Sequence, residues 1–145
     1  MAIDQAVCNS FKKELLEGIH DFESGADEFN LALYEDTANL SAATTAYPGD
    51  STGGQVSDTG EYSQGGGVLQ SQQTSLDTGV AIVTFANLSF TGVTLTARGA
   101  LIYNTSESNK AVAVLDFGGD KTATAGTFTI QFPAFTSTAA ILRIS

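Results

Sequence analysis

The sequence predicts a mainly β protein, with an N-terminal helix followed by an antiparallel β-sandwich or barrel and a long Gly- and Thr-rich loop or arm. Two observations lead to this prediction. The spacing of apolar residues changes from about 3.6 to 2 after residue 28. In the second half, short apolar segments are separated by Gly, Asn, Ser or Pro, and no helical pattern lies between them. Parallel βαβ units are therefore not expected.

The first segment predicts a helix with one apolar stripe. Lys12, Lys13 and Glu14 lie between the apolar positions, Asp4 is placed to cap the start, and Gly18 is placed to end the helix. The stripe consists of Ile3, Val7, Phe11, Leu15 or Leu16, and Ile19. A helix with such a stripe packs against another surface. We expect that surface to be the chain's own core, and a seam between subunits is the alternative.

The chain is expected to form a single domain, 1–145, because its length is sufficient for one hydrophobic core. The helix and an acidic linker occupy 1–24, and the β domain occupies 29–145. This β domain opens with Phe29, Leu31 and Leu33, which alternate with other residues in the pattern of a half-buried strand.

Residues 35–73 are poor in apolar side chains and rich in Ser, Thr, Gly, Asp and Gln. The sequence at 48–54 and a Gly-Gly-Gly run are strong turn signals. A gap of this length is unusual inside a small domain. It predicts either short strands near Val56 and at Val68-Leu69, or a flexible loop or arm over about 44–67.

The second half predicts six strands, two of which indicate how they are buried. The segment at 111–117 is apolar on both faces and is therefore placed centrally in its sheet. Phe128, Ile130 and Phe132 alternate with polar residues and should share one face. The six predicted strands are 80–85, 93–97, 100–103, 111–117, 127–132 and 140–144.

The charge distribution argues against a nucleic-acid partner and against an anionic membrane partner. The formal net charge is −10, and residues 1–61 carry twelve acidic and two basic side chains, whereas 62–145 carry four of each. Nucleic-acid binding depends on Lys and Arg at phosphates, and anionic membranes likewise attract basic segments. The acidic bias favours a role in solubility over a cation-binding face. No signal peptide and no membrane span are expected, which predicts synthesis in a reducing cytoplasm.

The sequence offers little chemistry for catalysis, and we expect neither an enzyme nor a cofactor or metal site. Cys8 is alone and is interpreted as a small buried hydrophobe. His20 is the only histidine, so any Ser-His-Asp relay would have to use it, and capping of the preceding helix is the preferred role. The Asp-Phe-Gly tripeptide at 116–118 has no other kinase element beside it. The acidic cluster of Asp21, Glu23, Asp27 and Glu28 is interpreted as a solvated linker.

Two stretches carry a resemblance to a known family. The first is AIDQAVCNSFKKELLEGIHDF, continued by FNLALYEDTANLSAATTAY, and the second is ARGALIYNTSESNKAVAVLDFGGDKTATAGTFTIQFP, with AILRIS at the end. Together they cover about two thirds of the chain, and they resemble small structural proteins from tailed-phage and prophage virion gene clusters. That family is similar in role to capsid decoration, or cement, proteins.

The resemblance implies a chain that is made in the bacterial host cytoplasm and binds the major capsid protein on the outer surface of the virion. It also implies that the chain associates with itself as a homotrimer and stabilises the capsid lattice. The implied oligomer or capsid contacts are Val7, Phe11, Leu15, Ile19, Tyr47, Pro48 and Tyr62.

Two other roles stay open. One is a head-fibre, tail or head–tail adaptor component of the virion. The other is a glycan-binding or hydrolytic surface module, which would need clustered carboxylates or a tyrosine platform in a cleft.

Overall fold

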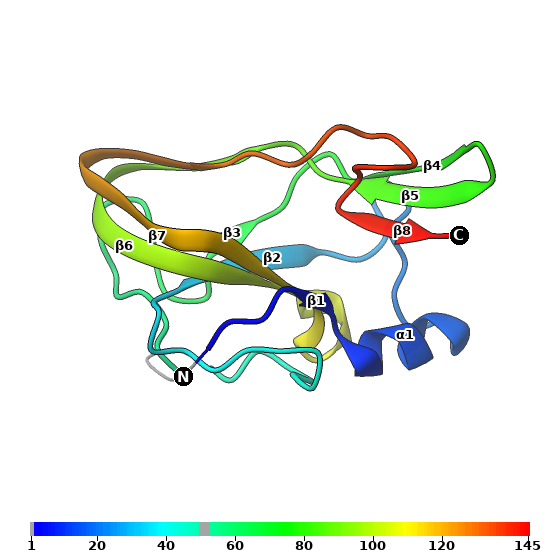
Figure 1. Cartoon of the computed structure of the whole chain (residues 1–145), viewed down its shortest axis with the longest axis horizontal. Coiled ribbons are helices and arrows are strands. Elements are labelled where there is room, and N and C mark those ends of the chain that lie inside the picture. The colour runs from blue at the N-terminus through cyan, green and yellow to red at the C-terminus, as the bar shows by residue number, and fades with distance from the viewer. Residues whose placement is uncertain (1, 50–52) are drawn as a thin grey trace.

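The computed structural model describes residues 2–49 and 53–145 and is shown in Figure 1. It is mainly β, with two antiparallel sheets and one short N-terminal helix. In chain order the elements are β1 (Ala6–Val7), α1 (Asn9–Leu16), β2 (Phe29–Tyr34), β3 (Gly67–Val68), β4 (Gln73–Asp77), β5 (Val80–Thr84), β6 (Leu88–Asn104), a 3-10 turn (Thr105–Glu107), β7 (Lys110–Ile130) and β8 (Leu142–Ile144).

The larger sheet has the strand order β1-β7-β6-β2-β3, and the smaller has the order β4-β5-β8. Every strand pair in both sheets is antiparallel. Figure 1 shows the long β6–β7 hairpin curling round at one end of the molecule, while the smaller sheet and α1 lie at the other end. One apolar cluster includes side chains from α1 and from both sheets.

The prediction of six separate strands in the second half is wrong in its middle part. The segments predicted at 93–97 and 100–103 are one strand, β6, and those at 111–117 and 127–132 belong almost entirely to one strand, β7. Bulges shift the β6–β7 register at several points without ending the ladder. The glycines between the predicted strands therefore bend these strands instead of terminating them. The strands predicted at 80–85 and 140–144 are confirmed as β5 and β8.

The predicted helix is too long at its start. Residues before Asn9 are extended: Ile3 forms a bridge with Leu40, and Ala6–Val7 pairs with β7. Asp4 does not cap the helix, because the helix begins at Asn9 with Cys8 at the N-cap position. The Asp4 N–H donates instead to the Leu40 carbonyl at 2.9 Å. The spacing of Ile3 and Val7 by four residues fits an extended segment as well as a helix. The extended form is preferred because pairing with the edge of β7 satisfies backbone groups that a first helical turn would leave without partners.

The end of the helix is predicted correctly. Gly18 has φ +71°, its N–H donates to Leu15, and the N–H of Ile19 donates to Glu14. This pair of hydrogen bonds is the Schellman arrangement, which turns the chain at a left-handed glycine and satisfies the last helical carbonyls. The turn directs the following residues back toward the core.

β2 is more deeply buried than its alternating sequence indicates. Every residue from Leu31 to Tyr34 is fully buried, so the prediction of a half-buried strand is wrong. β2 pairs with β6 on one side and with β3 on the other, and the loop residues Val56 and Tyr62 are buried in the same apolar cluster. The loop therefore helps to bury β2 on the side away from β6. The polar composition of 35–73 gave no sign that this segment contributes to the core.

The segment predicted as a loop or arm lies against the body wherever it is described, and residues 50–52 lie outside the described part. Ala46 forms a bridge with Lys110, and Gln55 forms one with Tyr34. The short strands predicted as the alternative are present as the Gln55 bridge beside Val56 and as β3.

Gly66 shows how closely this segment approaches β2. Its φ is +86°, and a Cβ atom at this position would lie 1.8 Å from the carbonyl oxygen of Leu31. Only glycine allows the two backbones to come this close.

Replacing Gly66 by alanine should therefore destabilise the fold far more than the same change at Gly25. Gly25 has a similar φ of +82° with nothing within 4 Å of its would-be Cβ, so G25A measures the left-handed strain alone, about 1 kcal/mol. G66A adds a steric overlap with a backbone atom, on the order of 1–3 kcal/mol more. Urea unfolding measures both. Equal losses would show that the close approach to Leu31 is absent in solution.

Candidate functional site

The only histidine belongs to a buried network that ties α1 to the end of β6. Nε2 of His20 lies 2.9 Å from the Glu14 carboxylate, and Nδ1 lies 3.0 Å from the side-chain nitrogen of Asn104. The same Asn104 nitrogen donates to Asp27 at 2.9 Å, and the Asn104 side-chain oxygen accepts from the Ser106 N–H at 3.0 Å. Because an amide nitrogen only donates, Nδ1 is the acceptor, and in the neutral ring Nε2 donates to Glu14.

His20 does not act as a helix cap, so that prediction is wrong. The turn at Gly18 carries the ring into the core, where it lies between Phe11 (centroids 4.8 Å apart) and Phe29 (6.5 Å). Its side chain has no exposed surface. The ring is thus out of reach of solvent, and the network joins α1 to the end of β6.

A second polar network holds the Gly- and Thr-rich loop. The side-chain oxygen of Gln55 accepts from the Tyr62 hydroxyl (3.1 Å) and from the Gly65 N–H (2.6 Å), and its nitrogen donates to the Tyr47 hydroxyl (2.8 Å). The Tyr62 hydroxyl also accepts from the Leu33 N–H at 2.9 Å. Since Tyr62 is fully buried, it anchors the loop to β2 and is no surface contact in this conformation.

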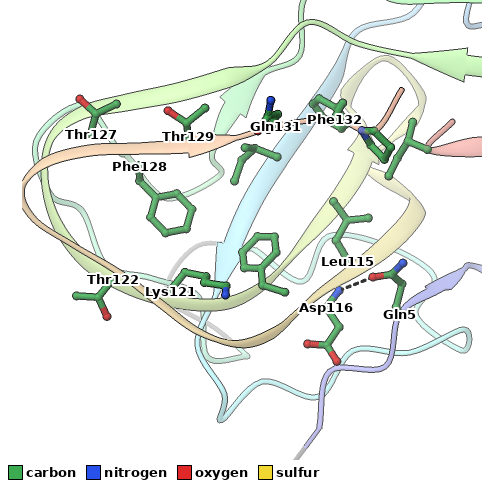
Figure 2. Close-up of a pocket in the computed structure, with 14 residues that line it drawn as sticks. Gln5, Leu115, Asp116, Lys121, Thr122, Thr127, Phe128, Thr129, Gln131 and Phe132 are labelled. Atoms are coloured by element: carbon green, nitrogen blue, oxygen red, sulfur yellow. Dashed lines mark hydrogen bonds between the residues drawn. The ribbon is translucent and has the colours of Figure 1, made fainter. Parts of the chain in front are cut away.

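β7, the residues that follow it and Gln5 line an open hollow of about 520 Å³, which we call the curl hollow (Figure 2). Its floor is apolar, and Figure 2 shows the ring of Phe128 pointing into it while Thr127 and Thr129 point away. Its polar lining comes from Gln5, Asp116, Lys121, Gln131 and several threonines.

Asp116 is the only carboxylate that lines the curl hollow. It accepts from the Gly118 N–H at 2.8 Å and from Arg98 at 3.1 Å, and these bonds hold its pKa below the ordinary value. No tyrosine lines the hollow. Among the residues that the structure describes, this hollow therefore has neither of the features that a glycan-binding or hydrolytic module would need, clustered carboxylates or a tyrosine platform.

A second hollow, of about 500 Å³, lies between α1 and the smaller sheet, and we call it the helix–sheet groove. The helix contributes Phe11, Leu15 and Leu16, and the strands contribute mainly small or apolar residues. From the strands the lining includes Ala81, Val83, Leu142 and Ile144. This groove is almost entirely apolar, unlike the curl hollow.

Large apolar side chains are exposed beside this groove. Among the described residues, Leu16 is 92% exposed, Leu76 73% and Ile144 59%. Leu16 and Ile144 line the groove. Leu76 pairs with Ala81, which pairs with Ile144, so these residues share one face of the smaller sheet. An apolar surface gathered in this way marks an interaction site more often than scattered hydrophobic residues do.

The sequence-predicted contact residues fall into two groups. Val7, Phe11 and Leu15 line the helix–sheet groove, with Phe11 itself buried. Ile19 is half-buried and does not line it.

The other predicted contacts lie in the loop. Tyr47 is half-buried and stacks on Tyr103, with ring centroids 4.4 Å apart, and Pro48 is exposed. Tyr62 is buried, as described above.

Sequence reasoning missed the strand face opposite α1. β4 was not predicted because QTSLD is mostly polar, with Leu76 as its single large apolar residue. The alternation in Leu142-Arg143-Ile144 was a usable signal, because it places Leu142 and Ile144 on one face and Arg143 on the other. The pairing of Leu76, Ala81 and Ile144 is a long-range contact that no local pattern reveals.

Two negative findings apply to the described residues. Within 2–49 and 53–145 no group of three or more His, Cys, Asp or Glu side chains is placed to hold a metal ion. No helix in these ranges has the length and apolar character needed to span a bilayer.

No protein-family model matches the sequence, and neither a search of curated proteins nor a search of solved structures finds a match. The resemblance to phage virion proteins therefore stays a prediction that experiments on the chain itself must test.

Cys8 should be unreactive in the native chain. It is fully buried at the start of α1, and burial, with the negative charge of Glu14 as a second cause, raises the pKa of its thiol to about 11. We expect labelling by Ellman's reagent at neutral pH to be at least about a hundredfold slower in the folded chain than in guanidinium. Fast labelling of the folded chain would mean that the segment around Cys8 opens readily.

The hydrogen bonds of Asp116 predict a pH-dependent effect. Because its folded pKa is lowered, its contribution to stability is present above the unfolded pKa and is lost as pH falls through the folded pKa. Asp116→Asn should therefore lower the urea midpoint at neutral pH and converge with wild type in acid. Asp120→Asn, an exposed neighbour, serves as the control and should change little. A deficit for D116N that persists at low pH would assign the effect to packing instead of charge.

Proposed function

We propose that this chain is a structural protein of a tailed-phage virion, a capsid decoration (cement) protein that binds the major capsid lattice on its outer surface. The observation that carries the proposal is the apolar surface around the helix–sheet groove, with Leu16, Leu76 and Ile144 exposed. A chain that works alone in water gains nothing from this surface, whereas a subunit covers it on assembly. The sequence resemblance supplies the identity of the assembly.

The body of the chain suits a load-bearing role. The loop over 53–67 is fastened by Gln55 and Tyr62, and the N-terminal segment is fastened by the His20 network. A single apolar cluster includes Phe11, Phe85 and Leu142, which supports two sheets that act together as one sandwich-like body. A rigid subunit loses little conformational entropy when it binds, which favours tight attachment to a lattice.

The proposed shell contact is at Pro48, whose side chain is exposed. Its base is ordered by the stacking of Tyr47 on Tyr103 and by the hydrogen bond from the Tyr47 N–H to the Asn109 carbonyl at 2.9 Å. An exposed residue on an ordered base can meet a neighbour at low entropic cost.

The copy number of the chain in purified particles tests this function. Quantitative mass spectrometry should find a ratio to the major capsid protein near one, because a cement protein repeats with the lattice. A few copies per hundred capsid subunits would replace the cement role by that of a fibre, tail or adaptor component. Absence from washed particles would contradict the virion role altogether.

A further inference from the structure

We infer that a second copy of this chain covers the helix–sheet groove. The inference rests on the proposed function in one respect, since it takes the chain to be an assembling subunit, and it specifies which surface joins the copies. This self-contact lies on α1 and the smaller sheet, whereas the proposed shell contact is at Pro48. The two contacts can therefore succeed or fail separately.

The first step is the extent of the uncovered surface. Antiparallel pairing places Thr74, Val83 and Leu142 in one row and Leu76, Ala81 and Ile144 in the next row on the same face. None of these six side chains is charged. α1 covers only part of this face, since Leu142 is buried while Ile144 and Leu76 are exposed.

The second step is shape. Leu16 is almost fully exposed at the end of α1, and beside it lies a groove of about 500 Å³. Each copy thus carries an apolar projection and an apolar hollow side by side. A neighbouring copy that inserts Leu16 into this hollow offers its own hollow to a third copy or back to the first, so the contact can repeat or close by symmetry.

The third step is charge. The chain has a net charge of −10, yet the charged residues that line the groove are both basic, Lys12 and Arg143. The Arg143 guanidinium donates to the Thr138 carbonyl at 2.7 Å and lies on the other face of β8, which leaves Lys12 as the charge at the groove. An acidic partner complements this site, and another copy brings Glu17 directly after Leu16. Glu17 is exposed to solvent in part and also pairs with Lys13 of its own helix. Among the described residues, no carboxylate lines the groove itself, so the groove does not add to the repulsion between two acidic copies.

A small apolar ligand fits these observations less well than a second copy does. Such a ligand would occupy the hollow but would leave Leu76 in solvent, because Leu76 lies on the sheet face outside the groove lining. A macromolecular surface covers the hollow and the exposed side chains together.

Sedimentation velocity of the purified chain over a range of concentrations tests the inference, with Leu16→Glu as the main variant. Wild type should associate as concentration rises. L16E should weaken association by about tenfold or more, because a carboxylate enters an apolar contact. Gln131→Glu adds the same charge to the curl hollow and should associate like wild type. Since Leu16 and Gln131 are both exposed, thermal melting should show that both variants fold.

Lys12 and Lys13 provide a matched test of the charge. Both are exposed on α1, but only Lys12 lines the groove. Lys12→Glu should weaken self-association, and Lys13→Glu, which breaks the exposed ion pair with Glu17, should weaken it much less. Equal effects would show that only total charge matters and would overturn the assigned contact.

Two further results would overturn the inference. One is a wild-type chain that stays monomeric up to its solubility limit, and the other is loss of association in Q131E but not in L16E. Binding to purified phage shells separates this inference from the proposed function. Shell binding by a monomeric chain would reject the self-contact and keep the decoration role. Self-association without shell binding would keep the self-contact and reject the decoration role.

Discussion

The ladder between β6 and β7 is the constraint on which the rest of the structure depends. β1 pairs with β7, and β2 pairs along its whole length with β6, so the ladder joins the two sides of the larger sheet. Buried backbone groups that lack partners cost as much as lost hydrogen bonds. β2 and β6 are far apart in the chain, which makes their pairing entropically expensive and expected to form late in folding. The loop over 53–67 then packs against β2, and the hydrogen bonds of the Gln55 side chain hold it in place.

The sequence predicted those features that depend on local pattern. It placed a helix that ends at Gly18, a strand at β2, the strands β5 and β8, and the common face of Phe128 and Ile130, both of which are buried. It failed where a distant partner decides the outcome. Residues 3–7 are extended because Leu40 and β7 offer them backbone partners. The edge of β2 opposite β6 is covered because a polar loop packs against it. His20 is buried because Glu14 and Asn104 satisfy its ring nitrogens, and a sequence pattern does not show such a network.

The candidate site also has one part that a local pattern predicted and one part that depends on distant partners. Val7, Phe11 and Leu15 were identified from the helical stripe, and they do line the helix–sheet groove. The opposite wall was missed, because Leu76, Ala81 and Ile144 come together only through strand pairing. The molecule thus combines an acidic surface, polar loops fixed by buried hydrogen bonds, and one apolar face that the chain does not cover by itself. This combination suits a subunit whose role is fulfilled in an assembly.

Hydrogen exchange measured on the free chain and on the assembled chain tests this account most directly. The account predicts that amides of α1, β4 and β8 exchange several-fold more slowly after assembly, because a neighbour covers the groove and the open edges of the smaller sheet. Exchange in the β6–β7 curl should change little, since that ladder is complete in the single chain. Unchanged exchange at α1, β4 and β8, with new protection confined to the curl, would contradict the central claim that the apolar face is the surface of assembly.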